Sequence, residues 1–199
     1  MKGSIATQHI RGLTTLLRDS VFALQPQDIG LKDADGPQVW GVVMESGFPR
    51  LTVSLVALAD GSVSIYMSDG GIIGCGLERE VRLAAGRMID SAQPFADVFP
   101  VTQATPPPAN GITQFYLLTR TGLRRTAMPS AQLDEGESEL AKLYWAGHRL
   151  IETVETLNAG HDLLDEMLAN DENEPRAGLR GRGCRIPLYV GNAVRRSHS

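Results

Sequence analysis

Apolar residues recur at steps of three and four positions in three segments of the chain, and this spacing predicts three amphipathic helices. The first extends from about Gln8 to Pro26, where proline stops it. The second covers residues 77–95. The third covers residues 140–157 and carries the longest apolar stripe of the sequence. Another apolar group at residues 163–168 either prolongs the third helix or forms a short helix of its own.

Strand patterns fill the region between the first two helices. Residues 39–44 are a short apolar run rich in β-branched side chains. Residues 51–58 and 63–67 each alternate, and Asp60-Gly61 separates them. This dipeptide is typical of a tight hairpin turn that needs positive φ at both central positions. The two runs therefore predict an antiparallel hairpin, with the serine face of the second strand, including Tyr66, toward solvent.

Two more strands are predicted before the third helix, at residues 112–119 and 123–128. Arg124 and Arg125 suit an edge strand, because charge there discourages pairing with another chain. The connection at residues 94–108 is rich in proline and cannot continue a helix, so we expect it to cross the surface as a stiff segment.

The predicted order of elements is α-β-β-β-α-β-β-α. It predicts an α+β fold with two layers, in which helices cover a five-stranded, mainly antiparallel sheet. A chain of 199 residues is long enough for one well-buried core. We assign residues 1–169 to a single α+β domain. Residues 170–199 form an arginine- and glycine-rich tail that we expect to be disordered or ordered by a partner.

The segment Ser68–Gly76, with the sequence SDGGIIGCG, is the most unusual local sequence of the chain. We interpret it as a corner between a strand and the second helix; the alternatives are a partner-binding loop and a cradle whose N–H groups bind an anion. The candidate residues of such a loop are Gly70, Gly71, Gly74, Cys75 and Gly76. No lysine follows to meet a phosphate, and Glu78 and Glu80 would repel an anion, so the structural corner is favoured.

The two cysteines, Cys75 and Cys184, lie in regions of very different character. Their placement predicts neither a disulfide framework nor a metal site, and no cofactor motif is present. Cys75 is a weak candidate for a catalytic nucleophile, since a thiol at a helix N-terminus can be acidified. None of the histidines stands in a thiol-enzyme signature with it, so an inert core cysteine is favoured.

The formal net charge of −4 does not fit a chain that binds nucleic acid through its overall field. No segment approaches the roughly 20 apolar residues of a membrane span, and no signal-peptide pattern opens the sequence. We therefore expect a cytoplasmic protein without a membrane partner.

Two surface features are candidates for partner contacts. Four large aromatic residues, Trp40, Phe48, Tyr66 and Trp145, include some that the predicted strand alternation leaves exposed. Of these, Phe48 and Tyr66 are the candidates for a partner contact. The tail arginines could contact nucleic acid or an acidic partner, although a solvated tail is favoured because only Tyr189 offers aromatic stacking. The arginines of this candidate site are Arg180, Arg182 and Arg185.

The phrases VWGVVMESGFP, LVALADGSVSIYMSDGGIIGCG and FYLLTRTGL occur in residues 39–76 and 115–123. With them the chain resembles a family of uncharacterised bacterial proteins. The resemblance implies a common domain from the first helix to the third, with the tail as an addition, and it implies no activity. The order of elements is also similar to that of type III secretion chaperone-like proteins, and loosely to profilin-like and roadblock-like sheets.

These observations predict a non-catalytic protein-interaction module, such as an adaptor or a chaperone-like subunit, whose partner is another protein or a second copy in a homodimer. The alternative is a protein that binds a small ligand or a nucleotide, or an enzyme that acts on one, through the Gly70–Gly76 loop and Cys75.

Overall fold

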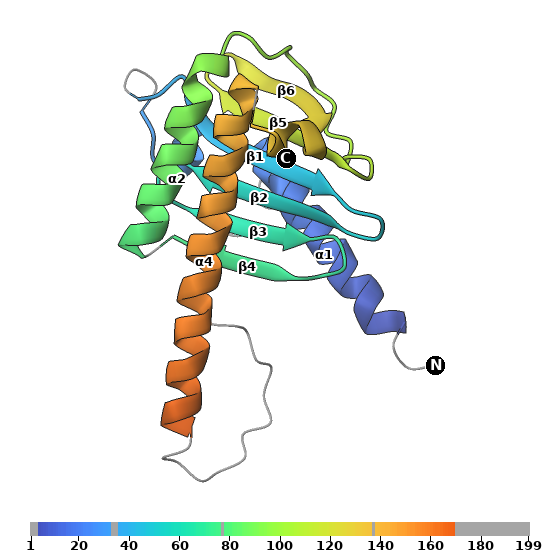
Figure 1. The fold of residues 1–199 in the computed structure, drawn as a ribbon, viewed down its shortest axis with the longest axis vertical. Helices are drawn as coiled ribbons and strands as arrows, with labels where there is room; N and C mark the ends of the chain where they lie inside the picture. Colours follow the sequence, from blue (N-terminus) through green and yellow to red (C-terminus); the bar gives the residue numbers. More distant parts are fainter. Residues whose placement is uncertain (1–3, 33–35, 77, 137, 170–199) are drawn as a thin grey trace, which may run out of the picture.

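The computed structural model describes residues 4–32, 36–76, 78–136 and 138–169. In these ranges, helices cover both faces of one antiparallel sheet (Figure 1). The predicted α+β class is confirmed. The helices are α1 (Ser4–Ala23), α2 (Arg79–Ala92), α3 (Ser130–Asp134) and α4 (Glu139–Ala169), with 3-10 turns η1 (Pro26–Ile29) and η2 (Gln93–Phe95). None of the helices in these ranges combines the length and the apolar character that a membrane crossing needs.

The sheet has six strands in the order β4-β3-β2-β1-β5-β6, and every neighbouring pair is antiparallel. The strands are β1 (Val39–Gly47), β2 (Thr52–Leu58), β3 (Val63–Met67), β4 (Ile72–Cys75), β5 (Ile112–Thr119) and β6 (Gly122–Pro129). The predicted hairpin joins β2 to β3. Of the two residues Asp60 and Gly61 only Gly61 has a positive φ, 89°, so the predicted turn with positive φ at both positions was wrong. The arginine pair lies on β6 at one edge of the sheet, as its charge predicted.

The sixth strand corrects the interpretation of the glycine segment. Ser68–Gly71 is a hairpin turn, in which the Gly70 N–H donates to the Met67 carbonyl oxygen at 2.9 Å. The chain then returns as β4 along β3, and α2 begins only at Arg79. The predicted corner between a strand and a helix was wrong, because Ile72 and Ile73 favour a strand and the positive φ of Gly70 allows the turn before them.

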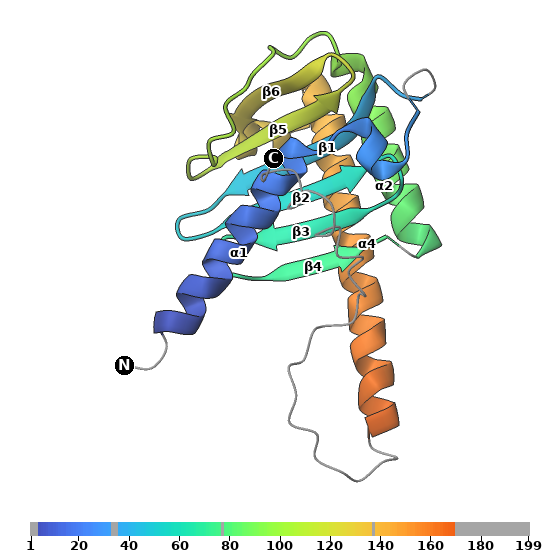
Figure 2. The same cartoon turned by 180° about the vertical axis from the view of Figure 1, so that it is seen from behind.

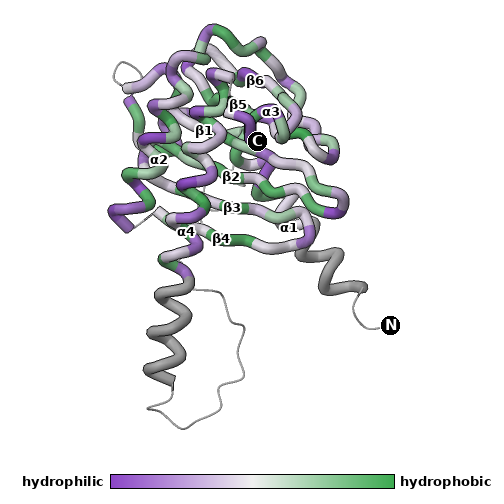
Figure 3. Tube along the Cα trace, in the orientation of Figure 1, coloured by the Kyte–Doolittle hydropathy of each residue, from purple (hydrophilic) through white to green (hydrophobic). Residues whose placement is uncertain are grey.

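One face of the sheet is covered by α2 and α4. Hydrophobic and hydrophilic positions alternate along both helices, as the sequence predicted (Figure 3). Leu143 and Leu150 of α4 and Met88 of α2 are fully buried against the sheet. Gly147 lets α4 approach β1, since an added Cβ would lie 2.7 Å from the Met44 sulfur. This face therefore holds the larger hydrophobic core.

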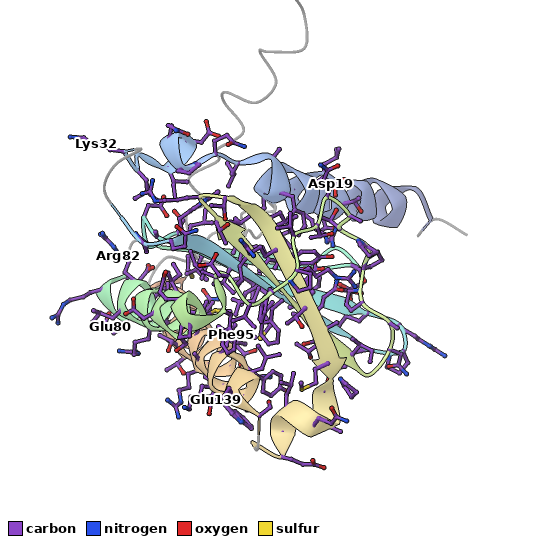
Figure 4. The ribbon with its side chains drawn as sticks, turned by 90° about the horizontal axis from the view of Figure 1, so that it is seen from above. Asp19, Lys32, Glu80, Arg82, Phe95 and Glu139 are labelled. Atoms are coloured by element: carbon purple, nitrogen blue, oxygen red, sulfur yellow. The ribbon has the colours of Figure 1, made fainter. Side chains whose placement is uncertain are left out.

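The opposite face is covered by α1, so the sheet lies between two layers of helices (Figures 2 and 4). The prediction was a fold of two layers, with helices on one face of the sheet. Val21 packs there in a second apolar cluster with Trp40, Val56 and Tyr116. Tyr66 packs against the same cluster, and burial raises its pKa. The serine face of β3 is therefore not left to solvent, because α1 docks on it. The amphipathic pattern of α1 did not indicate which face of the sheet it covers.

A buried ionic network also lies on the α1 face. Glu45 of β1 is 0% exposed, and its two carboxylate oxygens accept hydrogen bonds from Arg18 Nε at 2.6 Å and Arg18 Nη2 at 2.8 Å. Ser54 Oγ donates to Glu45 at 2.7 Å, and Gln114 Nε2 donates at 2.8 Å. The network ties α1 to three strands of the sheet through one carboxylate.

The proline-rich connection closes over this network. The Pro106 carbonyl oxygen accepts hydrogen bonds from Gln114 Nε2 at 2.7 Å and from the Tyr116 hydroxyl at 2.9 Å. Earlier in the connection, Val101 forms a bridge to Arg124 of β6. The connection is thus packed on the sheet by specific hydrogen bonds.

Candidate interaction site

An open groove of about 550 Å³ lies between α2 and α4, on the side of these helices that faces away from the sheet. Its lining includes Ala84 of α2 and Ala141 and Ala146 of α4, small residues that allow the two helices to pack closely. The start of α4 lies at one end, where the Ala141 N–H donates to the Ser138 carbonyl oxygen at 2.9 Å and to Ser138 Oγ at 3.2 Å. These hydrogen bonds hold the first turn of α4 at this end of the groove.

Trp145 gives the groove its apolar surface. Its side chain is 42% exposed, although the other large apolar side chains of α4 that the structure describes are buried or half-buried. The indole packs edge-to-face on Tyr144, with ring centroids 5.4 Å apart, and lies 5.6 Å from the His148 ring. Because the Tyr144 hydroxyl donates to Asp134 at 2.9 Å, the ring beneath Trp145 is held in place.

Burial changes the titration of the groups behind Trp145. Desolvation, together with the hydrogen bond to Asp134 and the charge of that residue, raises the pKa of Tyr144 to about 12. Burial lowers the pKa of His148, against the opposing charges of Asp134 and Glu152. At neutral pH both rings are therefore uncharged, and they form an apolar support for Trp145.

Basic side chains flank Trp145 on both helices. Lys142 and Arg149 lie three before and four after Trp145, which places all three on one face of α4. Lys142 pairs with Glu139 at 3.0 Å. Within the ranges that the structure describes, the guanidinium groups of Arg149 and of Arg87 on α2 have no ion-pair partner. The groove thus offers two free cations beside an exposed indole.

The groove offers an apolar surface and cationic groups. Among the described residues, no group of three or more His, Cys, Asp and Glu side chains is placed to hold a metal ion. The buried Nε2 of His148 makes no hydrogen bond to the described residues. A ligand with an apolar side chain and neighbouring carboxylates would complement this site, because the apolar side chain would pack on the indole and the carboxylates would bind the arginines.

The glycine segment that the sequence singled out lies apart from this groove. Gly70 and Gly71 belong to the β3–β4 turn, and Gly74 and Cys75 pair with Ser64 and Val63 in the sheet. Gly76 follows the strand directly. None of these glycines lines the groove between α2 and α4.

Cys75 ends β4 and is 4% exposed. It is disulfide-bonded, so the expectation that the cysteine placement gives no disulfide was wrong. In this state Cys75 carries no thiolate to act as a nucleophile. Cys184, the other cysteine of the sequence, lies outside the described residues, and the same holds for Arg180, Arg182 and Arg185 of the tail.

The two aromatic contact candidates have different surroundings. Phe48 is 52% exposed in the turn between β1 and β2, whereas Tyr66 is half-buried beneath α1. The structure does not bring them together into one patch. Sequence reasoning missed Arg87 and Arg149; the one available signal was that Trp145 falls outside the apolar stripe of its helix.

Comparisons of the chain with protein-family models, with curated proteins and with solved structures gave no match. The resemblance to a bacterial family therefore stays a prediction.

Proposed function

We propose that this protein is a non-catalytic interaction module, an adaptor or chaperone-like subunit that binds a short acidic segment of a partner protein in the groove between α2 and α4. The observation that carries the proposal is the half-exposed Trp145 between Arg87 and Arg149, two arginines without ion-pair partners among the described residues. Tryptophan and arginine are enriched among the residues that dominate protein–protein binding energy.

Charge supports an acidic occupant. The chain as a whole has a formal net charge of −4, yet the groove carries Arg87, Lys142 and Arg149 against Asp90 and Glu139. A guanidinium group binds a carboxylate through two parallel hydrogen bonds, so each free arginine can fix one acidic side chain. The local excess of positive charge would also steer an acidic segment toward the groove.

The length of the groove limits the size of the occupant. From Glu139 to Arg149, α4 rises about 15 Å, at roughly 1.5 Å per residue. This length corresponds to three turns of a helix or to about five residues of an extended chain. We therefore expect a short linear segment with one apolar anchor over Trp145 and carboxylates on each side.

A displayed library of 12-residue peptides, selected on the purified full chain, tests this function. We expect enrichment of peptides that combine Asp or Glu with an aromatic or aliphatic anchor, and at least a tenfold loss of their affinity in Trp145→Ala. Phe48→Ala is the matched control, because Phe48 is an exposed aromatic residue outside the groove. Binding that depends on Phe48 and not on Trp145 would contradict the proposal.

Charge reversal gives a second readout of the same site. Arg87→Glu and Arg149→Glu are each expected to weaken the selected peptides and to reduce the salt dependence of their binding. Arg79→Glu is the control, since Arg79 is exposed on α2 but does not line the groove. Equal losses in all three variants would indicate a general charge effect without a site.

A further inference from the structure

The long helix α4 extends well beyond the domain to which it belongs. Leu157 packs against the core, and the helix continues from there to Ala169. These last turns add about 18 Å, at roughly 1.5 Å per residue, and project past the edge of the sheet (Figures 1 and 2). A helical segment this short is marginal in water unless it packs on another surface, so we looked for a surface that would cover it.

The sequence of these last turns is apolar at some positions and acidic beside them. Residues 159–169 contain Asp162, Asp165 and Glu166 and neither lysine nor arginine, so this end of α4 is negatively charged. Apolar residues at steps of one, four and five positions share one face of a helix. The apolar residues with this spacing are Leu163, Leu164, Met167 and Leu168. An apolar face beside carboxylates suits a helix that packs on a second, basic surface.

The groove between α2 and α4 has the complementary character. It presents the half-exposed indole of Trp145 with Arg87, Lys142 and Arg149 around it. Along the first turns of α4 it is about 15 Å long, which is also the length of residues 159–169 as a helix. Charge, apolar surface and length therefore agree between the groove and the end of α4.

One copy of the chain cannot place this end in its own groove. The groove lies at the first turns of α4 and the acidic end at its last turns, and one continuous helix holds them apart. We propose that the protein forms a two-fold symmetric dimer, in which residues 159–169 of each copy occupy the groove between α2 and α4 of the other. This inference rests on the function proposed for the groove and names a second copy as the source of the acidic segment.

A single two-fold axis accounts for both contacts at once. An axis perpendicular to α4 at the level of Val154 makes the two α4 helices antiparallel, so the first turns of one lie beside the last turns of the other. In this register Trp145 is level with Leu163 of the second copy. Arg149 is then one helical turn from Asp162 of the second copy, a distance that an arginine side chain spans. The contact is reciprocal, so it closes at two copies and forms no filament.

Sedimentation equilibrium of the full chain at a series of concentrations tests the dimer. We expect a monomer–dimer equilibrium whose dissociation constant rises at least tenfold in Trp145→Ala. Phe48→Ala is the matched control, because Phe48 is an exposed aromatic residue outside the groove, and its dissociation constant is expected to stay unchanged. A chain that is monomeric at every concentration, or a dimer that Trp145→Ala leaves intact, overturns the inference.

Hydrogen exchange identifies the segment that enters the groove. Exchange in peptides covering residues 159–169 is expected to be at least tenfold slower in the dimer than in the dilute monomer. In Trp145→Ala it is expected to be as fast as in the monomer at both concentrations. A dimer in which residues 159–169 exchange at the rate of the monomer has another interface and refutes the proposed one.

A charge swap tests the pairing between the copies. Arg149→Glu and Asp162→Arg are each expected to raise the dissociation constant of the dimer at least tenfold. The double variant Arg149→Glu/Asp162→Arg restores opposite charges and is expected to return to within threefold of the wild type. Glu80→Arg is the control, since Glu80 is an exposed acid of α2 that does not line the groove. A double variant that dimerises no better than the single variants refutes this pairing.

The dimer and the function proposed for the groove fail in different ways. A monomer that binds the selected acidic peptides through Trp145 keeps the function and refutes the dimer. Loss of both peptide binding and dimerisation refutes both. A dimer that an excess of these peptides converts into monomers supports both, because the peptides and the end of α4 then compete for one groove. A dimer that the bound peptides leave intact refutes the proposed interface.

Discussion

The two faces of the sheet hold their helices by different physical means. The face under α2 and α4 is an apolar core, with Leu143, Leu150 and Met88 fully buried. The face under α1 combines a smaller apolar cluster with the fully buried carboxylate of Glu45. Apolar packing tolerates small shifts of a helix, whereas the two hydrogen bonds between Arg18 and Glu45 fix α1 at one position.

Such a network adds specificity more than stability. The desolvation of two charges offsets much of their attraction, so a buried pair gains little over an apolar pair of the same shape. Burial alone would lower the pKa of Arg18, but the hydrogen bonds and charge of Glu45 outweigh it and raise the pKa above its usual value. Arg18 therefore remains charged, and the loss of either partner removes both hydrogen bonds between the two side chains.

The largest effect is expected from Arg18→Met. It leaves the Glu45 carboxylate fully buried with only Ser54 and Gln114 as donors, and should lower the free energy of unfolding by about 3–5 kcal/mol. Urea unfolding at pH 7 measures this. Asp19→Ala is the control: Asp19 contacts Arg18 at 3.7 Å but is 59% exposed, so its loss should cost less than about 1 kcal/mol.

The double variant Arg18→Met/Glu45→Met sharpens the comparison. Since it removes the uncompensated charge together with its partner, it should be more stable than Arg18→Met alone. If both variants are equally destabilised, the cost lies in the packing of α1 and not in the buried charge.

On the α2/α4 face, the free energy of unfolding should depend only on the volume of the buried side chains. Leu143→Ala leaves a cavity among fully buried side chains and should cost about 2–5 kcal/mol in the same urea measurement. Leu16→Ala on α1 is the matched control, because Leu16 is 67% exposed, and its effect should stay within about 0.5 kcal/mol. A Leu143→Ala variant as stable as the wild type would mean that α4 is not held by this core.

The sequence predicted those elements whose signals are local. The Asp60-Gly61 hairpin, the apolar stripe of α4 and the edge position of Arg124 and Arg125 all follow from spacing or turn chemistry between near neighbours. β4 was missed because its two isoleucines stand between glycines, which favoured a loop over a four-residue strand.

Features that depend on tertiary contacts could not be predicted in this way. Glu45 directly follows the predicted strand at residues 39–44, and only the docking of α1 makes it a buried ion-pair partner. The groove depends on how α2 crosses α4, which neither helix specifies alone. Arg87 and Arg149 are far apart in the sequence, so their presence in the lining of one groove left no local signal.

The smallest expected effect is a pH dependence on the α2/α4 face. Tyr144 has a pKa of about 12 in the folded chain, against roughly 10 for an unfolded tyrosine. The neutral ring is therefore favoured by folding: its contribution is complete below pH 10 and is lost as the pH rises through 12. The expected loss is about 3 kcal/mol in all, since the two pKa values differ by roughly two units at 1.36 kcal/mol per unit.

Urea unfolding of the wild type and Tyr144→Phe between pH 8 and 11.5 measures this contribution by difference. At pH 8, Tyr144→Phe should be less stable by about 1 kcal/mol, because it lacks the hydrogen bond to Asp134. The gap should narrow above pH 10, since only the wild type must then ionise this hydroxyl on unfolding. Tyr116→Phe provides the matched test on the α1 face, where burial and the charge of Glu45 raise the pKa of Tyr116 as well. If the gap for Tyr144 stays constant to pH 11.5 while that for Tyr116 narrows, the coupling to alkaline pH belongs to the ionic face alone.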